Sequence, residues 1–416
     1  MVKKAFLFPG QGTQYVGMGK KLCSEFSVAS ETFDEASEAL SLDLKKLCFE
    51  GNIEELTLSY NAQPAILVTS VATYRVLEET MKKKPDIMAG HSLGELSALT
   101  CAGAIDFPDA VKIVRKRGQF MQDAVANGVG AMAAVETRDH DKVKELCKQI
   151  STDTKVLGIS NYNSRKQIVI SGHKEAVEEA IGVLEKDGIK SKKLKVSAPF
   201  HCALMQPAAE MFEQELSNYK FHDMKYPVLS NVDGKPYAGK EVIIKNLVSQ
   251  IVMPVQWSKS MDYLKMAMIQ YAVEVGPGKV LKNLMKTNHA DIKMFAYDNA
   301  SDAHELEKYV ESLNIPFLSR SLGIAVSTQN TNWNQEEYLK GVIEPYNKIE
   351  KMQAVIENEG RTATMDEMNQ AIQMLLILFK TKGVKKEEQI ALLQELFSDT
   401  GMEETFEEFD FSVINQ

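Results

Sequence analysis

A chain of 416 residues, 44% hydrophobic and 25% charged, has the composition of an ordinary folded protein, and its length allows two or three domains. The formal net charge of −9 argues against a nucleic-acid-binding surface spread over the whole protein. The longest apolar run, residues 374–379, is too short to cross a bilayer, and the four apolar residues before Pro9 are too few for a signal-peptide core. We therefore expect a cytoplasmic protein with neither nucleic acid nor a membrane among its partners.

The cysteine content agrees with a reducing compartment. The five cysteines are odd in number, lie far apart and form no C-x-x-C pair; they are Cys23, Cys48, Cys101, Cys147 and Cys202. Such a pattern is typical of reduced thiols and not of a disulfide framework or a zinc site. No metal site is therefore expected.

The first part of the chain alternates short apolar runs with longer helical patterns. We expect strands over residues 5–8 and 86–89, and helices over residues 63–82, 93–101 and 109–126. Alternation of this kind predicts a parallel sheet covered by helices.

A glycine-rich loop, FPGQGTQYVGMG, follows the first strand. The dinucleotide-binding fingerprint needs a third glycine where Tyr15 stands, and a phosphate-binding P-loop needs serine or threonine where Lys21 stands. We therefore reject nucleotide binding. The loop instead predicts close backbone packing beside a site, with Gln11 able to donate a hydrogen bond there.

The sequence AGHSLGELSAL, residues 89–99, places Ser92 between two glycines. Gly90 to Gly94 fit the G-x-S-x-G nucleophile elbow, in which a sharp turn between a strand and a helix exposes the serine hydroxyl at its tip. The glycines let the backbone turn without a Cβ clash, and the N–H groups that begin the helix point at an oxyanion formed beside that hydroxyl. A simple Gly-Ser turn between two core elements is the alternative, but the flanking strand and helix favour a nucleophile.

Residues 130–197 show a different order of predicted strands and helices. Strands are expected over 130–135, 156–162, 167–171 and 190–196, and helices over 139–149 and 174–187. The order βαββαβ is the ferredoxin-like plan. We expect this segment to be a small subdomain inserted into the larger domain.

The larger domain resumes with a strand over 271–275, a Gly-Pro-Gly turn at 276–278 and a helix over 279–286. After about residue 320 the chain becomes charged and helical, with helices expected over 335–357, around 374–379 and over 385–397, and it ends in an acidic, aromatic segment. No catalytic motif lies in this extension. Its apolar stripe either packs on the body of the protein or docks a partner protein, and the sequence leaves both open.

A serine nucleophile needs a base, and the chain has seven histidines. Five lie in polar or charged stretches and are expected at the surface: His140, His173, His222, His289 and His304. His91 adjoins the serine, and adjacent side chains on an elbow rarely point at each other. His201 follows a predicted strand in an apolar stretch; such a histidine is more often a buried structural residue, but beside an elbow it is the best candidate for the base. The third member of a triad cannot be chosen from the sequence.

Nine stretches together resemble one family, the malonyl-CoA:acyl-carrier-protein transacylases and the acyltransferases of polyketide synthases. They occur in the family's order between residue 4 and about residue 290: FPGQGTQYVGMG, AGHSLGELSAL, VRKRGQFMQDAV, GAMAAV, QIVISG, APFHCALMQPA, SNVDG, PVQWSKSM and EVGPGKVL. The resemblance implies an α/β fold, with a hydrolase-like core, a parallel sheet and an inserted ferredoxin-like subdomain. The expected domains are the core (1–127 and 198–320), the subdomain (128–197) and a C-terminal helical extension (321–416).

The resemblance also implies the catalytic residues. By position, Ser92 would be the nucleophile and His201 the base, and the backbone carbonyl of Gln250 would orient the histidine. The backbone N–H groups of Gln11 and Leu93 would form the oxyanion hole.

Further residues are implied at the substrate site. Arg117 would bind the free carboxylate of a malonyl group, although taken alone it would be expected at the surface of a helix. Phe200 resembles the malonyl-selecting versions of the site, whose bulky ring leaves little space for an α-methyl group. The remaining residues expected there are Gln250, His91 and Asn161, with Asn163 beside them.

The implied activity is that of an [acyl-carrier-protein] S-malonyltransferase, which moves malonyl from malonyl-CoA to the phosphopantetheine thiol of an acyl carrier protein or a polyketide synthase carrier domain through an acyl-serine. No cofactor is expected, because the CoA thioester is a substrate and the pantetheine belongs to the partner. The extension after residue 320 departs from free-standing fatty-acid enzymes and favours a trans-acting polyketide enzyme over fatty-acid synthesis. Two alternatives stay open: an editing hydrolase of carrier-bound acyl groups, which has no need of Arg117, and a scaffold that docks synthase modules through 321–416.

CoA and carrier proteins are acidic, so a chain of net negative charge needs local positive charge to bind them. The candidates are Lys186, Lys190, Lys192, Lys193, Lys195, Arg115 and Lys116. Solvated surface residues explain them equally well.

Overall fold

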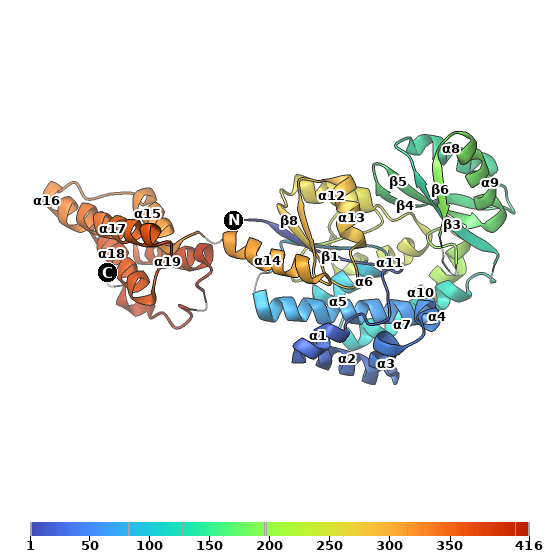
Figure 1. Cartoon of the computed structure of the whole chain (residues 1–416), viewed down its shortest axis with the longest axis horizontal. Helices are drawn as coiled ribbons and strands as arrows, with labels where there is room; N and C mark the ends of the chain where they lie inside the picture. The colour runs from blue at the N-terminus through green and yellow to red at the C-terminus, as the bar shows by residue number, and fades with distance from the viewer. Residues whose placement is uncertain are drawn as a thin grey trace. The chain divides into compact units, whose positions relative to one another are not determined.

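The computed structural model describes residues 2–81, 84–126, 128–194, 196, 198–313, 315–403 and 405–414. The chain divides into two compact units (Figure 1): an α/β unit, Val2–Leu306, and a helical unit, Glu307–Gln416. Each unit is described separately below.

The α/β unit is built on a five-stranded sheet in which every neighbouring pair is parallel. Its order is β7-β2-β1-β8-β9, with bounds β1 Lys4–Phe8, β2 Ile87–Gly90, β7 Val228–Leu229, β8 Tyr271–Glu274 and β9 Lys293–Ala296. The strands are short, apolar and almost wholly buried, as expected for a parallel sheet covered on both faces. The predicted α/β class is confirmed.

Helices cover both faces of this sheet (Figure 1). Helices α5 (Ser59–Met81) and α6 (Leu93–Cys101) lie on one face, and α12 (Trp257–Met266) and α13 (Val280–Asn288) lie on the other. The remaining α-helices of the unit outside residues 130–193 are α1 Lys20–Glu25, α2 Ser27–Leu40, α3 Leu44–Glu50, α4 Ile53–Thr57, α7 Phe107–Asp123, α10 Gln206–Leu216, α11 Ile243–Val252 and the first part of α14 Ala300–Leu313.

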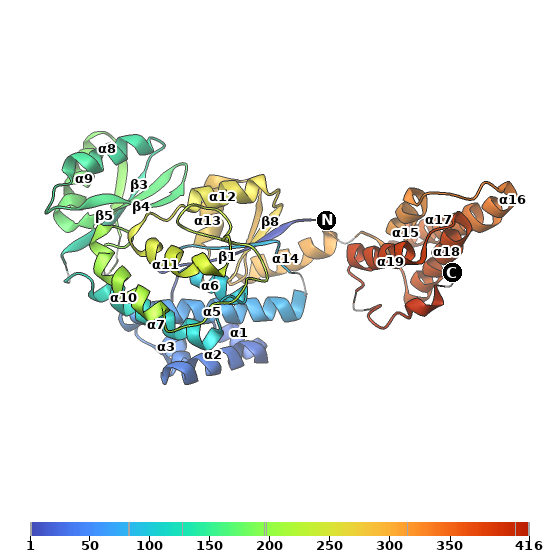
Figure 2. The ribbon, with the colours of Figure 1, turned by 180° about the vertical axis from the view of Figure 1, so that it is seen from behind.

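The predicted ferredoxin-like subdomain is present as a four-stranded antiparallel sheet of order β4-β5-β3-β6. Its elements are β3 Gly130–Glu136, α8 His140–Ile150, β4 Leu157–Ser164, β5 Gln167–His173, α9 Lys174–Lys186 and β6 Lys190–Lys193. The two helices lie side by side on one face of the sheet (Figure 2) and close a small apolar core of their own. The last strand is shorter than the expected range 190–196, and residues 195 and 197 lie outside the described residues.

Contacts of several kinds tie the subdomain to the core. A Cβ on Gly130 would lie 2.3 Å from the Pro199 ring, so the start and the end of the inserted segment are side by side. On β4, the backbone exchanges hydrogen bonds with Val255: Tyr162 donates to its carbonyl and Ser160 accepts from its N–H, both at 2.9 Å. Strand β4 is thereby fixed against the core at the position that carries Asn161.

The helical unit has its own apolar core. Its helices are the end of α14, then α15 Phe317–Ser327, α16 Gln335–Tyr338, a π-helical turn Leu339–Ile343, α17 Glu344–Glu359, α18 Met365–Lys382 and α19 Lys386–Thr400. The predicted helix over 335–357 is therefore one helical run interrupted by a π turn, and it ends at Gly360, whose φ is 63°. The acidic C-terminal segment packs back, with Phe406 stacked on Phe397.

The boundary expected at residue 320 differs from the observed one. Residue 320 falls inside α15, whose Phe317 and Leu318 are buried in the core of the helical unit. The division lies instead at Leu306, inside α14. Among the described residues, no helix is both long and apolar enough to span a membrane.

Candidate active site

Ser92 lies at the turn between β2 and α6, with φ 53° and ψ −106°. Positive φ is uncommon for a residue with a side chain. Close packing requires both flanking glycines: a Cβ on Gly90 would lie 1.8 Å from the Gly94 carbonyl oxygen, and one on Gly94 would lie 2.0 Å from that of Phe8. The structure thus contains the predicted elbow, held against β1.

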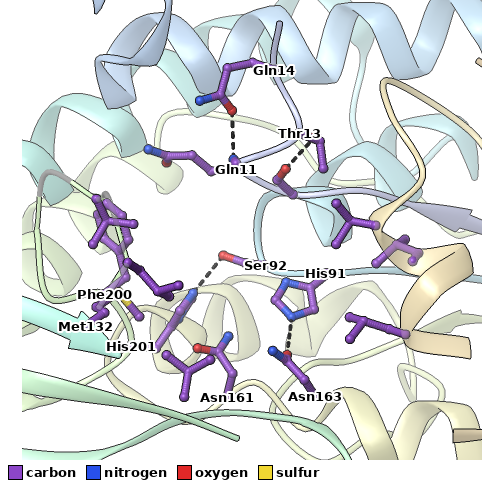
Figure 3. A pocket seen from close by; sticks show the side chains of 18 of the residues that line it. Gln11, Thr13, Gln14, His91, Ser92, Met132, Asn161, Asn163, Phe200 and His201 are labelled. Atoms are coloured by element: carbon purple, nitrogen blue, oxygen red, sulfur yellow. Dashed lines mark hydrogen bonds between the residues drawn. The ribbon is translucent and has the colours of Figure 1, made fainter. Parts of the chain in front are cut away.

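His201 lies within hydrogen-bond distance of the serine. Its Nε2 lies 2.8 Å from Ser92 Oγ, and its Nδ1 lies 2.7 Å from the backbone carbonyl oxygen of Gln250. Because a carbonyl can only accept, Nδ1 carries the proton and Nε2 faces the hydroxyl as an acceptor. The histidine favoured by the sequence and the carbonyl implied by the resemblance therefore come together. Figure 3 shows His201 pointing at Ser92.

Arg117 turns inward from α7 and is 1% exposed. One terminal nitrogen lies 3.2 Å from Ser92 Oγ and 2.8 Å from Gln250 Oε1, and the other lies 2.8 Å from Gln63 Oε1. Within the described residues none of its hydrogen bonds goes to a carboxylate, and its Nε has no partner. A buried guanidinium held by neutral oxygens is suited to bind an anion bidentately.

These groups open into one pocket of about 340 Å³ (Figure 3). The predicted residues that line it are Ser92, His201, Arg117, Phe200, Asn161, Asn163, Gln11 and His91. Gln250 does not line it; its side chain lies behind Arg117 and Ser92, 1% exposed. The expectation that Gln250 is a substrate-lining residue therefore differs from its place in the structure, because its amide is occupied by protein groups.

The two residues whose N–H groups are expected to form an oxyanion hole are a pocket-lining residue, Gln11, and the residue next to the serine, Leu93. Gln11 faces Ser92 across the pocket (Figure 3), and Leu93 is the first residue of α6. In the described part of the chain neither backbone N–H has a hydrogen-bond partner. The N–H of Ser92 itself donates to Asn231 Oδ1 at 2.7 Å.

His91 points away from the serine. Its Nε2 lies 2.9 Å from Asn163 Oδ1, and its ring packs beside Trp257 with centroids 5.4 Å apart. Burial lowers the pKa of His91, so the ring is neutral at pH 7. It borders the pocket without serving Ser92, as the sequence predicts.

Sequence reasoning did not single out Glu95, which is fully buried in α6. Its carboxylate accepts hydrogen bonds from the Tyr237 hydroxyl, the Gln250 amide at 2.6 Å and the Asn231 backbone N–H at 3.2 Å. The one signal in the sequence is a charged residue inside the small and apolar run LGELSAL.

Besides His91, burial and charge shift the pKa values of three ionisable groups near the serine. Burial, followed by the Arg117 charge, lowers the pKa of His201 to about 3. Burial lowers the pKa of Arg117 to about 10, and burial raises the pKa of Glu95 to about 7. At neutral pH the histidine is therefore an unprotonated base beside a charged guanidinium.

The basic residues considered for partner binding are mostly at the surface. Lys186, Lys190, Lys192 and Lys193 are exposed at the end of α9 and along β6, and Lys193 pairs with Glu178. Lys116 is exposed, Arg115 is half-buried over the Tyr60 ring, and Lys195 lies outside the described residues.

None of the five cysteines forms a disulfide, and four of them are buried. Among the described residues, no group of three or more His, Cys, Asp or Glu side chains is arranged to hold a metal ion.

The sheet, the elbow and the serine–histidine pair beside a buried arginine define an acyl-transferring α/β enzyme. Residues 5–306 match the acyl transferase domain family. Because this match covers most of the chain, the protein belongs to that family.

The curated relatives are more specific. A malonyl CoA-acyl carrier protein transacylase from Bacillus subtilis is 38% identical over 94% of this chain and 99% of its own length. The enzyme of that name from Escherichia coli K12 is 47% identical over 69% of this chain and 93% of its own length. The first relative thus shares the helical unit, whereas the second matches the α/β unit.

Solved structures agree with this assignment. The malonyl CoA-acyl carrier protein transacylase of Coxiella burnetii matches with a TM-score of 0.72 and 38% identity, over 74% of this chain and 98% of that one. A malonyl-transacylase solved in complex with its type II polyketide synthase acyl-carrier protein matches with a TM-score of 0.71 and 41% identity, over 74% of this chain and 99% of that one.

Proposed function

We propose that this protein is a malonyl-CoA:acyl-carrier-protein transacylase that works through an acyl-serine intermediate. One observation carries the proposal: Ser92 lies 2.8 Å from a carbonyl-oriented histidine and 3.2 Å from the buried guanidinium of Arg117, within one pocket. The first pair supplies a nucleophile and its base, and the arginine selects an acyl group that ends in a carboxylate.

The first half-reaction acylates the serine. His201 Nε2 takes the Ser92 proton as Oγ bonds to the thioester carbonyl carbon. The tetrahedral intermediate then breaks its carbon–sulfur bond, and His201 returns the proton to the departing CoA sulfur. The free N–H groups of Gln11 and Leu93 stabilise the oxyanion, a contribution of about 3–4 kcal/mol per donor in measured cases.

Arg117 couples substrate choice to this proton transfer. Its positive charge is one cause of the low pKa of His201. A malonyl carboxylate bound to Arg117 offsets that charge, so the histidine becomes more basic when the correct acyl group is present. Phe200, which is 8% exposed and lines the pocket, limits the space for an α-substituent; one methyl group is worth only about 1–3 kcal/mol of discrimination.

The second half-reaction transfers malonyl to the carrier. The pantetheine thiol gives its proton to His201 and attacks the ester carbonyl, and Ser92 leaves with that proton. The exposed lysines of α9 and β6 lead toward Leu194 and Val196, which line the pocket, and we place the acidic donor and carrier along this side.

We place the enzyme in polyketide synthesis, acting in trans in the cytoplasm, with fatty-acid synthesis as the alternative pathway. Two observations support this pathway. One similar enzyme was solved with a type II polyketide synthase carrier protein, and this chain has a helical unit that the shorter relatives lack. Five unpaired cysteines support a reducing compartment.

Intact-protein mass after mixing with malonyl-CoA tests the proposal. The wild-type protein is expected to gain one malonyl group, and Ser92→Ala is expected to gain none and to stop loading the carrier. Normal carrier loading by Ser92→Ala would contradict the mechanism.

The editing hydrolase is separated by a second measurement. A transferase turns malonyl-CoA over slowly without carrier protein and rapidly with it. Release of free malonate at the same rate in both conditions would favour the hydrolase. The hydrolase reading, however, gives no reason for a buried Arg117 beside the nucleophile.

A further inference from the structure

Glu95 is a buried carboxylate that the reaction steps above do not use. It lies three residues after Ser92, and its side chain is fully buried. One carboxylate oxygen accepts from the Tyr237 hydroxyl, and the other accepts from the Gln250 amide at 2.6 Å and from the backbone N–H of Asn231. Every group that bonds to this carboxylate is therefore a donor.

The carboxylate and the Ser92 carbonyl together determine how the Gln250 amide is turned. Oε2 of the carboxylate accepts from the Gln250 amide, so the amide faces it with Nε2. The same Nε2 donates to the Ser92 carbonyl oxygen at 2.9 Å. The amide oxygen is then left facing Arg117, from which it accepts a hydrogen bond at 2.8 Å. A flipped amide would present N–H groups to a guanidinium that can only donate, and this hydrogen bond would be lost.

The second glutamine that holds Arg117 is fixed less firmly. Gln63 accepts from the guanidinium at 2.8 Å, but its own amide nitrogen reaches only the Gln11 side-chain oxygen at 3.4 Å and the Met121 sulfur at 3.8 Å. Gln250 is therefore the firmer support of Arg117.

We propose that Glu95 is a positioning residue that fixes the orientation of Gln250 and so holds Arg117 where the terminal carboxylate of the acyl group can reach it. This inference rests on the proposed function, because it concerns which acyl groups the site accepts. Selectivity for acyl donors with a free carboxylate then depends on a residue that touches no substrate.

The test compares acyl donors on the full-length protein. Initial rates of covalent adduct formation are measured by intact-protein mass with malonyl-CoA and with acetyl-CoA, which lacks the carboxylate, and the malonyl-to-acetyl ratio is the readout. Glu95→Ala is expected to lower this ratio about tenfold, the effect of losing a hydrogen bond to a charged group.

Two further variants separate positioning from a structural role. Glu95→Gln keeps an acceptor of the same size but adds an N–H group that can face Gln250 and turn its amide, so the ratio is expected to fall by about threefold, between wild type and Glu95→Ala. Tyr237→Phe is the matched control, because it removes a hydrogen bond from the same carboxylate on the side away from Gln250; its ratio is expected to stay within about twofold of wild type. Melting temperatures report how far each change loosens the fold.

Equal ratios in wild type, Glu95→Ala and Glu95→Gln would overturn the proposal. A ratio in Tyr237→Phe as low as in Glu95→Ala would also overturn it, since loosening the buried cluster would then be enough. Should Glu95→Ala not fold, the comparison of Glu95→Gln with Tyr237→Phe decides by the same criterion. Absence of any malonyl adduct on the wild-type protein would instead contradict the proposed function.

Discussion

Arg117 shows at the scale of one residue how the site is prepared for its substrate. Its guanidinium is buried, and its partners are the oxygens of Gln63, Gln250 and Ser92. Neutral oxygens accept from its terminal N–H groups without cancelling its charge, so the strongest available partner is an anion that enters the pocket.

Replacing Arg117 by alanine should therefore change selectivity more than overall reactivity. We expect the rate of Ser92 acylation by malonyl-CoA to fall about a hundredfold, equivalent to about 3 kcal/mol, because a buried charge pair is lost. Acylation by acetyl-CoA should fall far less, since that donor offers nothing to the arginine. Adduct formation followed by mass spectrometry measures both rates, and an equal loss for the two donors would argue against carboxylate recognition.

The low pKa of His201 predicts an unusual pH dependence. A base with a pKa of about 3 is unprotonated throughout the range from pH 5.5 to 8, so kcat/KM for acylation should change by less than about threefold on its account. A histidine with an ordinary pKa of 6.5 would lose about fivefold between pH 6.5 and 5.5. Rate profiles with acetyl-CoA as donor distinguish the two, and an acid limb with its midpoint near pH 6.5 would contradict the buried, neutral base.

The control for this profile is Arg117→Ala. The arginine charge is the second cause of the low pKa of His201, so its removal raises that pKa. The acid limb should therefore move to higher pH in this variant.

At the scale of elements, the elbow depends on how closely α6 approaches β1. Gly94 lies in the first turn of α6, and a Cβ there would lie 2.0 Å from the Phe8 carbonyl oxygen and 2.9 Å from that of Pro9. The helix and the strand could not keep this distance with any larger residue, because the obstacle is backbone.

Gly94→Ala should consequently separate the two elements. We expect a loss of about 3 kcal/mol or more in the free energy of unfolding, together with loss of malonyl loading. Gly182→Ala is the matched control: this glycine lies in α9 with nothing within 4 Å of an added Cβ, so the change should be neutral or stabilising by up to about 1 kcal/mol. Thermal unfolding and adduct formation report both, and a fully active Gly94→Ala would show that the close approach is not needed.

The helices and strands near the motifs lie closer to their predicted bounds than the other elements do. Helix α6 was expected over the residues that it occupies, 93–101, and β5 and α9 begin at the expected residues. Helix α11, Ile243–Val252, was not expected: its isoleucine and valine residues favour a strand by intrinsic propensity. Packing against α10 stabilises the helical conformation, and the local sequence does not reveal this contact.

At the scale of the whole molecule, the two units differ in charge. Residues 307–416 contain 19 acidic and 10 basic side chains, whereas the rest of the chain contains 38 of each, so the helical unit carries the whole net charge of −9. The α/β unit is neutral overall. The unit that holds the active site therefore carries no net negative charge that would repel acidic CoA and carrier proteins, and it needs less local positive charge than the net charge of the whole chain suggests.

The helical unit also has a core of its own, which includes Leu375, Leu378 and Phe379 at 0% exposure. The part of its apolar stripe formed by these residues packs within the unit. The role of this unit as a docking element for a partner stays a prediction. Trp333, whose side chain is 88% exposed, is a suitable position for a substitution that tests it.

Removal of the residues after Leu313 should leave the chemistry intact. The truncated protein is expected to fold, since relatives of about this length exist, and to form the malonyl adduct within about threefold of the full-length rate. A slower transfer to the native carrier with an unchanged rate of adduct formation would support docking, and unchanged transfer would remove the docking role. Loss of adduct formation would contradict the independence of the α/β unit. Carrier loading and adduct mass, measured in parallel, separate these results.

The sequence by itself determined the features that depend on local spacing: the glycines around Ser92, the alternation that makes a parallel sheet, and the βαββαβ order of the inserted subdomain. For Arg117 pointing inward and the Gln250 carbonyl orienting His201, the residues gave no local signal beyond the family resemblance, and the tertiary structure decided both. It alone decided that Glu95 is buried beneath the nucleophile. The reason is physical: His201 bonds to a serine 109 positions away and Arg117 to a glutamine 133 positions away. Such pairs leave no periodic signature, because the folded chain, and not the neighbouring sequence, brings the partners within hydrogen-bond distance.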